Sequence, residues 1–165
     1  MARTAYVTIT GARQGPIKGE VTGIGRDGSI PLIALASQIV APFDQASGAV
    51  TGRRQHRPIV ITKPLDQATP KLYDALIKNE VLTDVTIKFW RPSAGPAGTG
   101  AEQQYFTIEL TNAHITEIAF VSADTQDPTK AAEVPYETVQ LVYQKISWTW
   151  VNGGIVAEDN WATTT

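Results

Sequence analysis

Hydrophobic and polar residues alternate along much of the chain, and this alternation predicts β-strands. In residues 105–111, Phe106, Ile108 and Leu110 occupy every second position, with threonine or glutamate between them. A period of two residues is typical of a half-buried strand. Comparable patterns predict strands at residues 6–10, 58–62, 85–91, 114–121, 136–144 and 146–150.

The stretch Ile30–Val40 differs, because it is apolar at both odd and even positions. Its β-branched residues and Pro31 favour a strand over a helix. A strand with two apolar faces is typical of one that is covered on both sides. We therefore predict that Ile30–Val40 forms a strand buried on both sides.

One short helix is expected near the middle of the chain. Thr69 is suited to the N-cap, and Pro70 to the first helical position, where a missing N–H costs nothing. Asn79 is a suitable stop. The apolar residues between them recur at helical spacing on one face: Leu72, Tyr73, Leu76 and Ile77.

Three polar segments separate the strands. Pro42–His56 contains small and polar residues followed by Arg53 and Arg54, and it predicts a long exposed loop. Loops of this length in compact domains are usually functional or flexible. Pro92–Gly100 predicts a hairpin loop and Ser122–Glu133 another polar loop.

These elements predict an all-β fold: a small barrel or a sandwich of two sheets, with one short α-helix at its side. A length of 165 residues suits a single domain spanning residues 1–165. Residues of the hydrophobic class make up 42% of the chain, enough for a sizeable core. The absence of cysteine excludes disulfides and thiol chemistry.

The charge balance argues against two classes of partner. The chain has 14 Lys and Arg against 16 Asp and Glu, so no strong field favours nucleic acid or an anionic membrane. No stretch is long and apolar enough to span a bilayer, and the first residues contain no apolar signal segment. We expect no nucleic-acid partner and no membrane insertion, and any export should need no cleaved signal.

Residues that could carry chemistry are few. The sequence contains no nucleophile elbow, phosphate-binding loop or zinc-protease motif. Neither His56 nor His114 has a second ligand at metal-binding spacing. His56 lies in the basic cluster Arg53–Arg57, which could contact an anionic partner, but we favour a solvated loop edge because the chain as a whole is not basic. We interpret His114 as a partly buried turn residue. We expect no enzyme, catalytic residue, metal or cofactor, although residues that converge only in space would be an alternative.

Large aromatic residues near the C-terminus allow two interpretations. Trp148 and Trp150 share one strand face, and they form either a platform for a sugar or base, or a wall against the core or another subunit. Trp90 has the opposite parity to Ile87 and Phe89, so one face of this strand carries either an exposed aromatic residue or a second contact. Strands that are apolar on both faces favour assembly with other subunits.

Two segments carry a family likeness. In Arg57–Tyr73 a strand ends in a Thr-Lys turn, and Asp-x-Ala-Thr-Pro-x-Leu opens the short helix. In Glu137–Trp150 a Glu-x-Val-x-Leu strand runs through Gln-Lys-Ile into a final strand. These segments resemble the haemolysin-coregulated protein (Hcp) family of type VI secretion. The Gly-rich segment Gly11–Gly28 and the Trp-containing C-terminus depart from that pattern. These departures leave open a divergent clade of the family or a tail-tube protein of another phage-like contractile machine.

The resemblance implies a structural subunit of the secretion inner tube. Six copies would join their sheets edge to edge in a ring, and stacked rings would be expelled, with effectors carried or chaperoned in the lumen. The implied partners are further copies of the chain and the sheath, spike and effector proteins. The tube would assemble in the bacterial cytoplasm and pass to the exterior or into target cells without a signal peptide.

The resemblance also implies that the long loop reaches a neighbouring subunit or ring. The interface residues expected there are Phe43, Asp44, Gln45, Ser47, Val50, Thr51, Arg53 and Arg54. The alternative from a different class is a monomeric β-barrel that binds carbohydrate or another ligand on Trp148 and Trp150.

Overall fold

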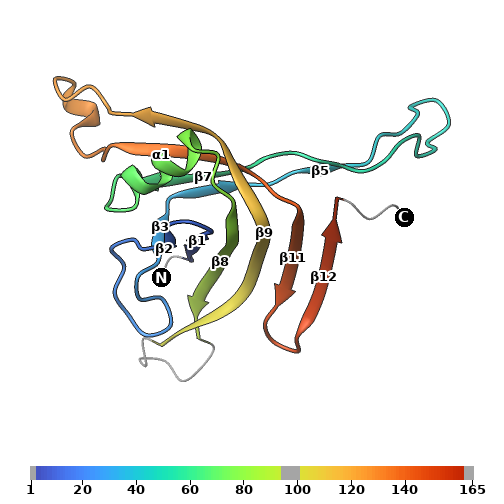
Figure 1. Cartoon of the computed structure of the whole chain (residues 1–165), viewed down its shortest axis with the longest axis horizontal. Helices are drawn as coiled ribbons and strands as arrows, with labels where there is room; N and C mark the ends of the chain where they lie inside the picture. Colours follow the sequence, from blue (N-terminus) through green and yellow to red (C-terminus); the bar gives the residue numbers. More distant parts are fainter. Residues whose placement is uncertain (1–2, 94–100, 162–165) are drawn as a thin grey trace.

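The computed structural model describes residues 3–93 and 101–161 (Figure 1). These residues are mainly in strands with one α-helix, so the expected all-β class is confirmed. The elements are β1 (Thr4–Gly11), β2 (Gly15–Ile17), β3 (Ile30–Leu32), β4 (Ala34–Ala36), β5 (Ile39–Val40), β6 (Gln55–His56), β7 (Ile59–Pro64), α1 (Thr69–Ile77), β8 (Leu82–Pro92), β9 (Glu102–Val121), the 3-10 turn η1 (Pro128–Lys130), β10 (Tyr136–Val142), β11 (Lys145–Trp150) and β12 (Ile155–Asn160).

The long strand β9 takes part in two antiparallel sheets. Its first part pairs with β8 on one side and β11 on the other, while its last part pairs with β10. The first sheet continues from β8 to β1 and from β11 to β12, and the second from β10 to β7 and β4. Figure 1 shows β9 curving from one sheet into the other.

The prediction of separate strands at residues 105–111 and 114–121 was therefore wrong. Asn112 lies between them with φ of 51°, and the ladder with β10 shifts register at Gln140 and Leu141. Asparagine tolerates a positive φ better than most residues. The two predicted strands therefore form one continuous strand, with a positive φ at Asn112 and a register shift opposite residues 115–117.

The prediction of one buried strand over Ile30–Val40 was also wrong. This segment forms three short strands: β3 pairs with β1, β4 with β7, and β5 with β6. Ile33, between β3 and β4, is 57% exposed. The segment crosses from one sheet to the other, so its apolar residues meet different surroundings. The sheet is not closed into a barrel.

Apolar side chains from both sheets and α1 form one continuous core. Ile87 and Leu110 of the first sheet and Ile61 and Val139 of the second are fully buried. The helix contributes Leu72 and Ala75. Burial of these side chains is the main stabilising term for the two-sheet body.

Helix α1 lies where the sequence predicts it and packs against β9. Its N-cap is Ala68 with no side-chain cap, so the assignment of Thr69 to that position was wrong. The Thr69 hydroxyl donates to Glu137 Oε1 at 2.9 Å and accepts from the Asp66 N–H at 3.2 Å. Thr69 thus ties the helix start to β10.

The segment predicted as a long loop is a two-stranded arm. Residues 39–56, called the arm below, extend away from the body in Figure 1. Strands β5 and β6 pair at its base, and Phe43 and Val50 form a bridge farther out. Residues 94–100 of the predicted hairpin loop lie outside the described residues, while Pro92 and Glu102 beside them are paired.

Candidate assembly interface

The outer part of the arm presents apolar side chains to solvent. Phe43 and Val50 face each other across the arm and are 59% and 68% exposed. The Thr51 N–H donates to the Pro42 carbonyl at 2.9 Å, which continues the pairing of the two segments. An exposed apolar pair on a projecting hairpin is a feature of interaction surfaces.

A polar turn closes the arm. Asp44 accepts hydrogen bonds from the Ser47 hydroxyl at 2.6 Å and the Ser47 N–H at 3.0 Å. These bonds lower the pKa of Asp44 below its usual value. Gln45 is exposed beside them. The turn therefore has a defined shape, and its residues position Phe43 and Val50.

Arg53 and Arg54, predicted as part of the same interface, lie at the base of the arm and bond to residues 159–161 of their own chain. Arg53 Nη2 donates to the Trp161 carbonyl at 3.0 Å. Arg54 forms an ion pair with Asp159 and donates from Nη2 to the Asn160 carbonyl at 3.1 Å. Both arginines thus attach the base of the arm to the end of β12.

His56 completes this attachment, so its interpretation as part of a solvated loop edge was wrong. The residue is buried, with Nε2 2.6 Å from Asp159 Oδ2 and Nδ1 2.8 Å from the Tyr143 hydroxyl. We call Arg54, His56, Tyr143 and Asp159 the arm-base cluster. Tyr143 and Asp159 are 87 and 103 residues from His56, so no local sequence signal indicates this contact.

The electrostatics of the arm-base cluster follow from its geometry. Hydrogen bonding from Arg54 lowers the pKa of Asp159 to about 2, and the hydrogen bond with His56 adds to the effect. Burial raises the pKa of Tyr143 to about 12, and the Asp159 carboxylate adds to the effect. Asp159 is therefore anionic and Tyr143 neutral at physiological pH.

A second cluster lies inside the body. Lys63 Nζ is 2.6 Å from Glu137 Oε1, 3.0 Å from Asp66 Oδ1 and 3.1 Å from Thr69 Oγ1. We call these four residues the buried cluster. Lys63, Asp66 and Thr69 belong to one of the two family-like segments, and Glu137 begins the other. Four residues of the family-like segments thus connect β7, the start of α1 and β10.

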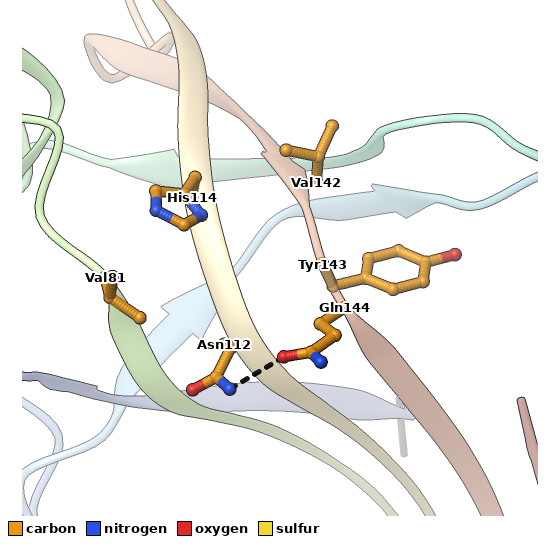
Figure 2. A pocket seen from close by; sticks show the side chains of 6 residues that line it. All are labelled: Val81, Asn112, His114, Val142, Tyr143 and Gln144. Atoms are coloured by element: carbon orange, nitrogen blue, oxygen red, sulfur yellow. Dashed lines mark hydrogen bonds between the residues drawn. The ribbon is translucent and has the colours of Figure 1, made fainter. Parts of the chain in front are cut away.

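An open cleft lies where β9 bends (Figure 2). It has a volume of about 620 Å³ and is lined by Val81, Asn112, His114, Val142, Tyr143 and Gln144. Asn112 Nδ2 donates to Gln144 Oε1 at 2.8 Å. His114 is half-buried on β9, not in a turn as predicted. The lining contains no carboxylate that could serve as its acid–base partner.

The tryptophans do not form a joint open platform. Trp148 packs against the core, and Trp150 lies 5.9 Å from the Tyr105 ring under the guanidinium of Arg91. On the other face, Arg26 lies 5.1 Å from the centroid of Trp90. Trp148 therefore fits the core-wall interpretation, and Trp90 makes a second contact, which is one of the two alternatives that its parity allows.

Comparison with known proteins decides the family. Residues 6–150 match the family described as "Type VI secretion system effector, Hcp". The chain belongs to the Hcp family. It is 35% identical to the "Major exported protein" of Pseudomonas aeruginosa over 170 residues, which cover 98% of this chain and 96% of that protein.

Solved Hcp structures share the fold. A structure described as Hcp protein has a TM-score of 0.87 and 27% identity, covering 99% of this chain and all of that one. Hcp1 from Escherichia coli EAEC 042 has a TM-score of 0.83 and 30% identity, covering 97% and 99%. Secreted protein Hcp3 of Pseudomonas aeruginosa has a TM-score of 0.78 and 29% identity, covering 98% and 100%.

Membership confirms the family predicted from the two segments. Hcp proteins are secreted structural tube proteins of type VI secretion that self-assemble, and they are not enzymes. Among the described residues, no helix has the length and apolar character needed to cross a membrane. No group of three or more His, Cys, Asp or Glu in these ranges is arranged to hold a metal ion.

Proposed function

We propose that this Hcp protein forms closed rings, six copies to a ring, which stack into the inner tube of a type VI secretion machine. The observation that carries the proposal is the arm, which holds Phe43 and Val50 away from the body. The arm reaches a copy in the same ring or the next one. Burial of its apolar tip there stabilises the assembly.

A sheet edge supports ring closure. Strand β12 pairs with β11 on one side and has no strand partner among the described residues on the other. Its Ile155 and Val156 are 68% and 56% exposed. An unpaired edge with apolar side chains favours pairing with another chain, and repetition of one heterologous contact closes a ring.

The ring has a lumen that holds or chaperones effectors, and the tube engages the sheath and spike proteins. Rings assemble in the bacterial cytoplasm and are then exported to the exterior or into target cells. The family membership and the balanced net charge of −2 support these proposals. A small net charge suits repeated self-contact, because strong like charge would oppose it.

The first test replaces the apolar tip of the arm. We expect the double substitution Phe43→Asp and Val50→Asp to leave the monomer folded, because both side chains are exposed, and to abolish stacking. Negative-stain microscopy and light scattering will show wild-type stacked rings with a central hole. The variant will give rings or monomers with an unchanged melting temperature. A deletion of residues 46–51 should act in the same way.

Ile24→Asp is the matched control, since Ile24 is 99% exposed and lies outside the arm. We expect this variant to stack like the wild type. A wild-type protein that stays monomeric at high concentration contradicts the tube function. Stacking that survives the double substitution contradicts the assignment of the arm.

A further inference from the structure

We propose that Arg3, Arg91, Tyr105 and Trp150 form a carboxylate-binding site that takes the acidic loop 122–135 of a second copy of this chain. The inference rests on the proposed function and specifies one contact between successive copies. Below, the four residues are called the cationic end and residues 122–135 the acidic loop. Three observations support the site: the strand register that gathers the aromatic rings, the stacking of two guanidinium groups on those rings, and the lack of a carboxylate paired with either arginine in the described residues.

An irregularity in the sheet gathers the aromatic rings of the cationic end. In the ladder between β8 and β9, Phe89 pairs with Phe106 but Trp90 pairs with Gln104, so Tyr105 is an extra residue. Such a bulge re-aims a side chain. The Tyr105 ring accordingly lies 6.5 Å from Phe89 and 5.9 Å from Trp150, on the aromatic side of the sheet.

Two guanidinium groups flank these rings. The Arg91 Cζ atom lies 4.9 Å from the centroid of Tyr105 and 5.4 Å from that of Trp150, and the Arg3 Cζ atom lies 5.7 Å from that of Tyr105. A guanidinium stacked on a ring keeps its N–H donors in one plane, where they suit a carboxylate. The rings thus hold Arg91 ready for an anionic partner.

Arg26 is also stacked on aromatic rings, and it is paired with a carboxylate of the same chain. Arg26 lies 5.2 Å from the centroid of Tyr6 and 5.1 Å from that of Trp90, and its Nη1 atom is 2.5 Å from Glu102 Oε2. All 16 Asp and Glu lie within residues 3–93 and 101–161. None of them forms an ion pair with Arg3 or Arg91. The cationic end lacks the acid that completes the Arg26 site.

The surface beside Arg91 has room for an incoming side chain. A depression of about 410 Å³ is lined by Arg91, Gln103, Gln104, Tyr105, Val151, Asn152 and Gly153. Amide groups of Gln103 and Asn152 supply further hydrogen-bond donors at its edge. The chemistry of the depression suits a carboxylate on a protein segment.

The acidic loop supplies that carboxylate. It contains Asp124, Asp127 and Glu133 against Lys130, a net charge of −2. Asp124 and Asp127 accept bonds from the Gln126 N–H at 2.9 Å and the Thr129 hydroxyl at 2.7 Å within the loop. Exposed Glu133 has no side-chain bond of this kind in the part of the chain described, so it is the acid available for Arg91.

Position in the fold favours a second copy as the source. The cationic end lies near the first residues of β9 and the acidic loop follows its last residue, so they lie at opposite ends of the body in Figure 1. One molecule therefore cannot join them. A contact between one end of a copy and the other end of the next propagates in a line, as a stacked tube requires.

A charge swap tests the contact. We expect Arg91→Glu, Arg3→Glu or Glu133→Arg to weaken the association of rings about tenfold, since each places like charges together. The double variant Arg91→Glu with Glu133→Arg should return to within about threefold of wild type. Sedimentation velocity over a salt series measures the association, and wild-type association should weaken as salt increases.

Lys71→Glu is the matched control, because Lys71 is an exposed helix residue and the change alters net charge equally. We expect it to associate like the wild type. A thermal melt will show whether Arg91→Glu is folded. If it is not, Arg3→Glu tests the contact in its place. Wild-type association unaffected by salt and by the single variants overturns this contact alone. A wild type that never associates overturns the proposed function as well.

Discussion

Two clusters of charged side chains hold this molecule together in different ways. In the buried cluster, the side chains of Lys63 and Glu137 are 0% exposed and join β7 to β10. In the arm-base cluster, the Asp159 side chain is 22% exposed and joins the arm to β12. One cluster lies inside the body, and the other lies where a projecting element leaves it.

The difference teaches what each cluster contributes. A buried charge is costly unless it is paired, so the buried cluster makes the body intolerant of losing any one partner. In the arm-base cluster, the side chains of Arg54 and Asp159 are 23% and 22% exposed, so water remains an alternative partner for this ion pair and its loss costs less. We infer that the buried cluster fixes the fold, whereas the arm-base cluster fixes the direction of the arm.

The largest effect is expected from Lys63→Met. This change leaves Glu137 and Asp66 buried without their counter-charge, and it should lower the free energy of unfolding by about 3–5 kcal/mol. Urea denaturation of the purified protein measures the difference. The helix start should loosen as well, because Lys63 also contacts the Thr69 hydroxyl.

Lys71→Met provides the comparison, since the same substitution is made at an exposed site. It should change the free energy of unfolding by no more than about 0.5 kcal/mol. If Lys63→Met costs no more than Lys71→Met, the buried cluster does not stabilise the body and the contrast between the clusters fails.

The sequence predicts the elements of the body well, because their signals are local. Alternation is sufficient for the strand at residues 105–111, and the Thr69-Pro70 start locates α1 within a residue. Of the four residues of the buried cluster, Lys63, Asp66 and Thr69 lie in one family-like segment and Glu137 lies in the other. Their contact was not predicted, because 74 residues separate Lys63 from Glu137 and only the tertiary fold brings them together.

The arm and its base were harder to predict, for two physical reasons. Pro42–His56 shows no alternation, because both faces of a projecting hairpin meet solvent. His56 looks polar and exposed in sequence, yet Tyr143 and Asp159 bury it from distant parts of the chain. The interface role of the eight arm residues stays a prediction: the outer ones are exposed, while Arg53 and Arg54 bond to residues 159–161.

The stability of the arm-base cluster should depend on pH, because the Asp159 carboxylate must be ionised to pair with Arg54 and His56. The native pKa of Asp159 is about 2, below its usual value of 3.8, because Arg54 and His56 stabilise the carboxylate. A lowered native pKa gives stability that is present above the usual pKa and is lost as pH falls toward the native value. Wild type should therefore exceed Asp159→Asn in unfolding free energy at pH 5, and the gap should close toward pH 2.

Urea denaturation at pH 5, 3.5 and 2 follows this gap, with Asp27→Asn as control. Asp27 is exposed and forms no ion pair in the described residues, so its variant should follow the wild type at every pH. A gap for Asp159→Asn of equal size at pH 5 and pH 2 would show that the carboxylate charge does not hold the arm.

The smallest effect is expected at a third ion pair, which extends the comparison to the surface. Lys145 Nζ lies 3.0 Å from Glu158 Oε2 between β11 and β12, and the two side chains are 38% and 59% exposed. Exposed pairs contribute about 0–1 kcal/mol, because water and salt screen them. Lys145→Met should therefore lower the free energy of unfolding by less than about 1 kcal/mol in urea.

Both variants replace lysine with methionine, so the difference between their losses of unfolding free energy reflects the burial of the two ion pairs. Moderate salt should weaken the wild-type Lys145 pair further and narrow its difference from the variant. The Lys63 value should barely respond to salt, since its partners are out of contact with solvent. Equal costs at Lys145 and Lys63 would mean that burial does not decide what an ion pair contributes in this fold.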